Sequence, residues 1–259
     1  MSGKKPVIKY YKKALKLAEA GKYGEALEIV REIRSKHWKN MALYKIVPQL
    51  AKAGKYSEAL EVVKEIKDGY WKGNALASMA SELAKVASEL SKTGKYDDAD
   101  NVFDKALKIA RKIRDKYWKS KALKSIALKL AKSGKYGEAL EVARKIEFID
   151  WKNEVLANIT TGLTKEGKYD EAMDLAKEIK DRKLRKKAIA QIKENCIKAA
   201  NHYLDILPSE DRDEINPKLI KKIRKGKIND VVIEFVKNIG EYMKEKEELI
   251  KEIKELVKK

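Results

Sequence analysis

The stretch from Ala122 to Ile146 reads ALKSIALKLAKSGKYGEALEVARKI, and it contains the pattern on which the fold prediction rests. Apolar side chains recur at steps of three and four residues on both sides of Gly134, as one face of an α-helix requires. A glycine between two such faces predicts a left-handed turn, because glycine adopts a positive φ without strain. The stretch therefore predicts two helices joined by a tight turn.

The glycine turn belongs to a phrase that recurs along the chain. Gly-Lys-Tyr-x-Glu/Asp-Ala begins at five glycines, which are Gly21, Gly54, Gly94, Gly134 and Gly167. These positions lie 33, 40, 40 and 33 residues apart, which identifies an internal repeat. A tryptophan stands 17 residues after three of the glycines, at Trp38, Trp71 and Trp151. Because one helix pair cannot bury its apolar face alone, the pairs must stack on one another.

The recurring phrase Gly-x-Tyr-x-Glu-Ala resembles the tetratricopeptide repeat. A small or apolar residue stands seven positions before four of the glycines, at Val47, Ala87, Ala127 and Thr160, and the resemblance covers residues 7–200. It implies an all-α fold, a right-handed α-solenoid of antiparallel helix hairpins with a C-terminal helical extension. It also implies a peptide or protein partner in the groove of the solenoid. The period of 33 residues departs from the family's 34.

The repeats and the segment after them predict two domains. Residues 1–207 form the repeat solenoid and residues 208–259 a C-terminal helical segment, because a polar stretch from Pro208 to Pro217 interrupts the apolar pattern. The two longer intervals each carry seven extra residues, on either side of Gly94. Seven residues add two helical turns, or roughly 10 Å, to a helix. We therefore expect an elongated hairpin over residues 72–117 that projects past its neighbours.

The C-terminal segment carries an apolar seam whose members alternate at steps of four and three residues. Lys246 interrupts this seam, and Gly240 also weakens a long continuous coiled coil. Two interpretations stay open. The helix either caps the last repeat or joins a second copy of the chain in a homodimer, through Phe235, Ile239, Tyr242, Leu249, Ile253 and Leu256.

Side chains that could carry out a reaction are sparse. The two histidines, His37 and His202, and the single cysteine, Cys196, do not have the spacing of metal ligands. The phrase Gly-Lys-Tyr lacks the second glycine and the hydroxyl residue of a phosphate-binding loop. Cys196 has apolar neighbours at helical spacing, which is typical of a small buried side chain. We predict that the protein is not an enzyme and uses neither a cofactor nor a metal.

The composition also narrows the cellular setting. A single cysteine allows no disulfide within the chain, which fits a reducing compartment. The N-terminus lacks the apolar run of a signal peptide, and no stretch approaches the ~18 apolar residues that span a bilayer. We therefore expect a cytoplasmic protein without membrane contact. Charged residues make up 39% of the chain and are rich in Lys and Glu, a bias of proteins from thermophiles.

The chain has a net charge of +20, from 60 basic and 40 acidic residues, and such a surface attracts polyanions. The repeat arranges part of this charge in two rows on opposite edges. One row follows the turn glycines and includes Lys22, Lys55, Lys95, Lys135 and Lys168. The other follows the tryptophan position and consists of Lys39, Lys72, Lys119, Lys152 and Arg185. A plainer interpretation is that lysines near helix ends stabilise the helix dipole and need no partner.

Two clusters of basic residues are denser than helix capping requires. The first is Lys180, Arg182, Lys183, Arg185, Lys186 and Lys187, and the second is Lys218, Lys221, Lys222, Arg224, Lys225 and Lys227. The Trp and Tyr residues recur at fixed repeat positions, which favours core packing over base stacking. We therefore predict a non-catalytic protein that docks on the phosphate backbone of structured RNA or a ribonucleoprotein, with a ribosomal particle as the favoured target. The alternative is an adaptor that binds a peptide or protein in the solenoid groove.

Overall fold

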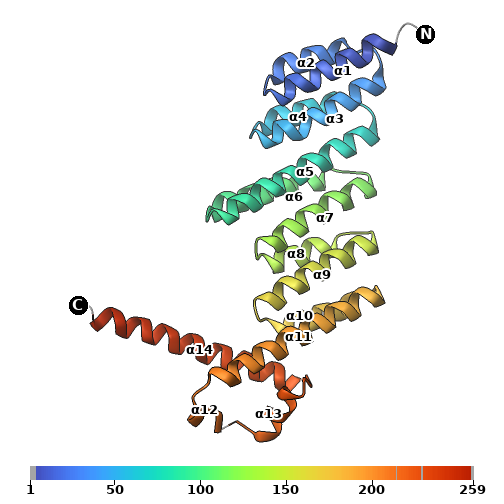
Figure 1. Cartoon of the computed structure of the whole chain (residues 1–259). Coiled ribbons are helices and arrows are strands. Elements are labelled where there is room, and N and C mark those ends of the chain that lie inside the picture. The colour runs from blue at the N-terminus through green and yellow to red at the C-terminus, as the bar shows by residue number, and fades with distance from the viewer. Residues whose placement is uncertain (1–3, 214, 229, 258–259) are drawn as a thin grey trace. The chain divides into compact units, whose positions relative to one another are not determined.

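The computed structural model describes residues 4–213, 215–228 and 230–257, with side chains for 7–213, 215–228, 230–243 and 245. The described residues form an all-α repeat fold (Figure 1). The chain divides into two compact units, Met1–Val155 and Leu156–Lys259, here called the N-terminal and the C-terminal unit. This division falls within the helix Ile149–Lys165, and the boundary between residues 207 and 208 stays a prediction.

The N-terminal unit is a row of antiparallel helix hairpins. The first helix of one hairpin packs against the first helix of the next, as α1 does on α3, α3 on α5 and α5 on α7. The helices are α1 (Lys4–Glu19), α2 (Tyr23–Glu32), α3 (Lys36–Lys52), α4 (Tyr56–Glu65), α5 (Gly69–Lys92), α6 (Tyr96–Arg111), α7 (Lys116–Lys132), α8 (Tyr136–Arg144) and the start of α9 (Ile149–Lys165).

Each hairpin turns at the glycine of the repeated phrase. All five turn glycines have φ between 75° and 78°, in the left-handed region that only glycine adopts cheaply. At Gly134 the turn is closed by two hydrogen bonds. The Lys135 amide donates to the Leu130 carbonyl at 3.0 Å, and the Gly134 amide donates to the Ala131 carbonyl at 3.2 Å. This is the Schellman arrangement that ends α-helices.

Replacing Gly134 by alanine should lower the free energy of unfolding by about 1 kcal/mol, because a Cβ there must adopt a left-handed φ. Gly137→Ala is the matched control, since Gly137 lies three residues on within α8 and has open space around it. That change should stabilise the protein by about 0.5–1 kcal/mol through helix propensity. Urea denaturation measures both variants, and equal effects of the same sign would contradict the turn geometry.

The alanine of the repeated phrase lets the helices approach closely. Ala26, Ala59, Ala99, Ala139 and Ala172 are all fully buried. An isoleucine that follows each second helix is buried in the same way, at Ile33, Ile66, Ile113, Ile146 and Ile179. The first helices add larger side chains such as Leu43, Leu83 and Ile126. Every repeat therefore buries an alanine and an isoleucine at equivalent positions.

Aspartates mark the start of several first helices. The Asp68 carboxylate accepts a hydrogen bond from the Trp71 amide at 3.1 Å, and the Asp115 carboxylate accepts one from the Trp118 amide at 2.9 Å. Asp181 does the same for Leu184 at 2.6 Å in the C-terminal unit. Such caps satisfy backbone amides that have no partner within the helix. Ser35 stands at the equivalent position but makes no side-chain cap bond.

The hairpin around Gly94 is longer than its neighbours. α5 has 24 residues where α3 and α7 have 17, and α6 has 16 where α4 has 10 and α8 has 9. The seven-residue insertions thus lengthen both helices of one pair by similar amounts. Figure 1 shows the tip of α5 and α6 reaching past the tips of the adjoining hairpins.

The C-terminal unit contains the end of α9 and the helices α10 (Tyr169–Glu178), α11 (Arg182–Ile206), α12 (Ser209–Asp213), α13 (Pro217–Arg224) and α14 (Asp230–Val257). The N-terminal part of α14 packs on α11 and α10. There Phe235 is buried, Ile239 is half-buried and Tyr242 is exposed, with its hydroxyl 3.3 Å from Asp211. Leu249, Ile253 and Leu256 lie outside the side chains that the structure describes, so self-association through the seam stays a prediction.

Candidate nucleic-acid interface

The first turns of α11 present a group of exposed basic side chains, here called the α11 cluster: Arg182, Lys183, Lys186 and Lys187. Asp181 caps the helix immediately before them, and the first turn itself contains no acidic residue. The positive end of the helix dipole lies at this terminus, so cations here are electrostatically unfavourable. Helix capping therefore does not account for the placement of this cluster.

The same predicted cluster includes two further residues, of which one is not exposed. The Arg185 side chain is half-buried, and its guanidinium donates a hydrogen bond to the Ile179 carbonyl at 3.0 Å. That bond satisfies a backbone oxygen where α10 ends. Lys180 is exposed and precedes the Asp181 cap. Arg185 is thus a structural contact, and we leave it out of the α11 cluster.

A second group of exposed or half-buried cations lies on and after α13, here called the α13 cluster: Lys218, Lys221, Lys222, Lys225 and Lys227. Within the described side chains, neither this cluster nor the α11 cluster makes an ion pair. Lys221 and Lys222 occupy the last turn of α13, where a cation suits the helix dipole. The α13 cluster therefore has a partly structural explanation that the α11 cluster lacks.

Arg224 connects α13 to α11. Its guanidinium donates to the Asn201 side-chain oxygen at 3.1 Å and to the Asp205 carboxylate at 2.5 Å. The hydrogen bond from Arg224 lowers the pKa of Asp205 below its ordinary value. Residues 182 and 201 are 19 positions apart on α11, which places this attachment about 28 Å along the helix from the start of the α11 cluster. Arg224 thus fixes the α13 cluster at the far end of the same helix.

Four of the five lysines after the turn glycines pair with carboxylates. Lys55 pairs with Glu58 at 2.6 Å, and Lys168 pairs with Glu166 at 3.0 Å. Lys135 bridges two hairpins by pairing with Asp100 at 2.7 Å, and its hydrogen bond to Asp100 raises the pKa of Lys135. Lys95 is exposed. These pairs reduce the positive charge of the row, so its members do not make one open cationic edge.

The lysines after the tryptophan position have a structural use that sequence spacing did not reveal. The Lys39 ammonium donates to the Arg31 carbonyl at 2.8 Å, and the Lys152 ammonium donates to the Arg144 carbonyl at 3.2 Å. Arg185 makes the equivalent bond to Ile179. Each of these cations therefore caps the carbonyl end of the preceding hairpin's second helix, where the dipole favours positive charge.

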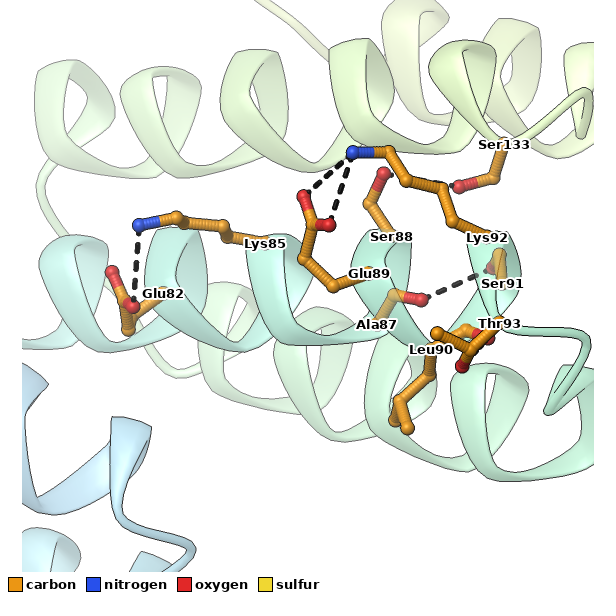
Figure 2. A network of polar contacts seen from close by, with 10 residues as sticks. All are labelled: Glu82, Lys85, Ala87, Ser88, Glu89, Leu90, Ser91, Lys92, Thr93 and Ser133. Carbon is orange, nitrogen blue, oxygen red and sulfur yellow. Dashed lines mark hydrogen bonds and ion pairs between the residues drawn. The ribbon is translucent and has the colours of Figure 1, made fainter.

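In the long hairpin, the exposed face of α5 carries ion pairs between side chains of α5 itself. Figure 2 shows Lys92 bonded to both oxygens of Glu89, at 2.9 and 3.0 Å, and Lys85 near Glu82 at 3.8 Å. The Ser133 hydroxyl lies 3.3 Å from that of Ser88 and connects α7 to α5. A hollow of about 290 Å³ lies between this face and the end of α3. Its charges are balanced, so it is a poor site for a polyanion.

A ladder of aromatic rings runs along the N-terminal unit, and the regular recurrence of its tryptophans predicts core packing. Trp118 is buried, with 5% of its surface exposed, but Tyr70 is 60% and Tyr117 is 46% exposed. Tyr70 and Tyr117 lie directly before the tryptophan position, where other repeats have His37, Asp150 and Lys183, so the prediction of core packing for the fixed Trp and Tyr positions does not cover them. Adjacent residues of a helix point in different directions, so the residue before a packed tryptophan can face solvent.

Candidate chemistry is limited among the described residues. No group of three or more His, Cys, Asp or Glu residues in the described part of the chain is arranged to hold a metal ion. Cys196 is fully buried, and burial raises the pKa of its thiol to about 12, so it is not a thiolate near neutral pH. None of the helices in the described chain combines the length and apolar character needed to cross a membrane.

Comparison with protein families gives two partial matches. Residues 152–255 match the GreA-associated C-terminal domain, and this range contains both basic clusters. Residues 49–69 match the PPR repeat and include the Gly54 turn and α4. No curated protein matches the chain.

Solved structures with related folds are distant. Ton1535 from Thermococcus onnurineus NA1 is 25% identical, with a TM-score of 0.32 over 84% of this chain and 63% of that chain. The chain thus spans less than two thirds of Ton1535. A Podosopora anserina protein with nearly identical TPR-like repeats, named for the kinesin light chain, is 14% identical with a TM-score of 0.32, over 72% of this chain and 98% of that chain. The fold assignment rests on the hairpins of this chain.

Proposed function

We propose that this chain, a TPR-like helical-repeat protein, docks on the phosphate backbone of structured RNA or a ribonucleoprotein through the α11 and α13 clusters. Helical-repeat folds of this kind are typical of binding scaffolds. A ribosomal particle is the target that we put forward, because it offers folded RNA on a large surface. Binding is stoichiometric, and the protein contributes shape and charge without a reaction.

The α11 cluster is the observation that carries the proposal. Arg182 and Lys183 are exposed cations in the first turn of α11, where the dipole disfavours them, and Lys186 and Lys187 follow in the next turn. None of the four makes an ion pair among the described side chains, although the Asp181 carboxylate caps the same terminus. An arrangement that costs stability in the free protein is explained if an anion neutralises it in a complex. Phosphate oxygens suit this position, since the backbone amides of the same terminus also attract anions.

The placement of the two clusters toward opposite ends of α11 also favours a rigid target. About 28 Å along α11 separates Arg182, the start of the α11 cluster, from Asn201, where Arg224 attaches α13. A flexible strand would lose entropy to reach both, whereas a folded RNA presents phosphates at fixed separations. Recognition by shape and backbone contact is the usual mode for helical RNA, whose deep groove hides the bases.

Binding to an RNA hairpin across a salt series tests the proposal. Each neutralised phosphate releases counterions, so the affinity should fall steeply between about 50 and 200 mM salt. Fluorescence anisotropy of a labelled hairpin measures this slope with the full chain. Sedimentation with purified ribosomal subunits then tests the proposed target. An affinity that does not depend on salt would exclude phosphate contacts as the basis of binding.

The decisive variant carries four substitutions in the α11 cluster, Arg182→Gln, Lys183→Gln, Lys186→Gln and Lys187→Gln. It should weaken RNA binding at least tenfold and reduce the salt slope by roughly 0.7–0.9 for each phosphate that the variant no longer neutralises. Removing cations from the first turn should stabilise α11 by a few tenths of a kcal/mol, so loss of folding does not account for weaker binding.

A control variant with the same change in net charge distinguishes the effect of the α11 cluster from the effect of the protein's total charge. Four exposed lysines of α1 serve this purpose, in the variant Lys9→Gln, Lys12→Gln, Lys13→Gln and Lys16→Gln. This control should retain most of the affinity. Equal losses in both variants would show that net charge, and not the α11 cluster, determines binding.

The second candidate function is a protein adaptor. The match of residues 152–255 to a domain named for its association with GreA favours a protein partner for the C-terminal unit. An adaptor should bind its partner with a weaker salt dependence, because the core of a protein interface is depleted in charged residues and no counterions condensed on phosphates are released. The salt series therefore separates the two functions.

A further inference from the structure

The aromatic ladder of the N-terminal unit is continuous over four hairpins. His37 contacts its own Trp38 and, at 5.5 Å between ring centroids, Trp71 of the next hairpin. The pattern repeats without a gap. Tyr70 lies 5.4 Å from Trp71 and 5.3 Å from Trp118, and Tyr117 lies 5.0 Å from Trp118 and 5.3 Å from Trp151.

Each hairpin of the ladder exposes one outer ring to solvent. His37 and Tyr70 are exposed, Tyr117 follows, and Phe148, 41% exposed, contacts both Tyr117 and Trp151 at the end. The tryptophans lie deeper and hold the outer rings in edge-on and tilted contacts. Such contacts fix the orientation of a ring and lower the entropy cost of stacking a ligand on it. The exposed rings thus form an ordered stripe.

Positive charge accompanies this stripe. The segments 35–41, 67–73 and 112–121 that carry the first three rungs contain two, two and five basic residues, against none, one and one acidic residue. The two acidic residues, Asp68 and Asp115, are occupied as helix caps. At the fourth rung Glu147 and Asp150 lie beside Phe148 in the sequence, and Lys116 pairs with Glu147 at 3.1 Å. The surroundings of the first three rungs are therefore cationic, and those of the fourth are not.

Two of these cations line one hollow on the N-terminal unit. Lys72, which directly follows Trp71, and Lys112, at the end of α6, both line a hollow of about 380 Å³, which Glu61 and Lys64, paired with each other, also line. Its apolar wall comes from Leu60, Val63 and Leu76. Neither Lys72 nor Lys112 has an ion-pair partner among the described side chains. An anionic group with an adjoining flat apolar group would satisfy both the cations and the wall.

We propose that the exposed ladder binds a single-stranded stretch of nucleic acid, with bases stacked on Tyr70, Tyr117 and Phe148. The phosphates lie against Lys72 and Lys112. Stacking on aromatic side chains combined with a cationic groove is how proteins hold single strands without sequence preference. The inference extends the proposed function, because a folded RNA also offers unpaired segments. It concerns a different unit of the chain and a different kind of contact.

A uridine-only RNA tests the ladder, because it forms no duplex. All four tryptophans, Trp38, Trp71, Trp118 and Trp151, belong to the ladder, so the intrinsic tryptophan emission reports on this surface alone. Adding the RNA to the full chain at low salt should quench that emission in a saturable manner. Absence of both quenching and anisotropy change would overturn the inference and would favour a peptide partner for this stripe.

Tyrosine variants locate the contact. Tyr70→Ala and Tyr117→Ala should each weaken binding of the uridine RNA about tenfold, the loss of one stacked base. Tyr70→Phe and Tyr117→Phe keep the ring and should restore binding, which separates stacking from any loss of folding. Tyr96→Ala is the matched control, since Tyr96 is 62% exposed in the same unit but lies off the ladder. Equal affinities for Tyr70→Ala, Tyr117→Ala and Tyr96→Ala would overturn the inference.

A parallel titration with the RNA hairpin keeps the two proposals apart. The tyrosine variants should bind the hairpin stem normally, and the α11 cluster variant should keep the ladder's quenching by uridine RNA. If the protein binds the RNA hairpin but not the uridine RNA, the ladder inference is overturned and the proposed function stands. If it binds the uridine RNA through Tyr70 and Tyr117 but does not bind the RNA hairpin, the proposed function is overturned and the ladder inference stands.

Discussion

Replacing Phe103 by alanine should lower the free energy of unfolding of the N-terminal unit by about 3–5 kcal/mol. Phe103 is the largest of the fully buried side chains, with 1% of its surface exposed. It belongs to the apolar face of α6, whose partner in the long hairpin is α5. Alanine removes the ring and leaves a cavity that two long, paired helices cannot readily collapse.

Urea denaturation followed by tryptophan emission measures this change, because all four tryptophans lie in the N-terminal unit. Leu107→Ala, in the same helix, is the control. Leu107 is half-buried, so its truncation should cost clearly less than that of Phe103. Comparable losses for both variants would mean that this face of α6 does not pack as the structure has it.

Replacing Gly73 by valine should destabilise the N-terminal unit by about 1–3 kcal/mol, through overpacking against Trp118. A Cβ at position 73 would stand 2.7 Å from the Cδ1 atom of that indole, closer than any ordinary contact. The indole has little room to retreat, since it is buried and contacts Tyr70 and Tyr117. Tryptophan emission should shift as well, because the strain falls on the ring itself.

The same helix supplies the control for this substitution. Gly69 lies at the start of α5 and has nothing within 4 Å of an added Cβ. Gly69→Ala should leave stability unchanged or raise it slightly, because alanine favours helix. Thermal denaturation with emission spectra compares the two. A Gly73→Val protein as stable as the parent, with an unchanged spectrum, would show that α5 and α7 do not approach so closely at Trp118.

Local sequence signals were sufficient to predict the hairpins. Apolar side chains at helical spacing identified the helices, and the repeated glycines identified the turns, all of which have positive φ. The extra residues around Gly94 predicted longer helices there, as found in α5 and α6. These features depend on a few neighbouring residues, which is why the sequence is sufficient to predict them.

The charged site was less accessible to sequence reasoning. Which lysines are neutralised depends on contacts between hairpins, such as Lys135 with Asp100, and residue spacing does not give that register. Lys39 and Lys152 donate hydrogen bonds to backbone carbonyls of earlier helices, and no pattern of side chains in the sequence predicts these bonds. The density of the α11 cluster was predicted, but its open exposure emerged only from the folded chain.

The five equivalent buried alanines have a consequence for how such a chain can change in length. Each second helix buries the same small residue at the same place in its repeat, whichever hairpin follows. A whole hairpin is therefore a repeat unit, and duplicating or deleting one should leave the packing between the remaining hairpins intact. The reach of the N-terminal unit is thus adjustable in steps of one repeat unit, without redesign of its interior.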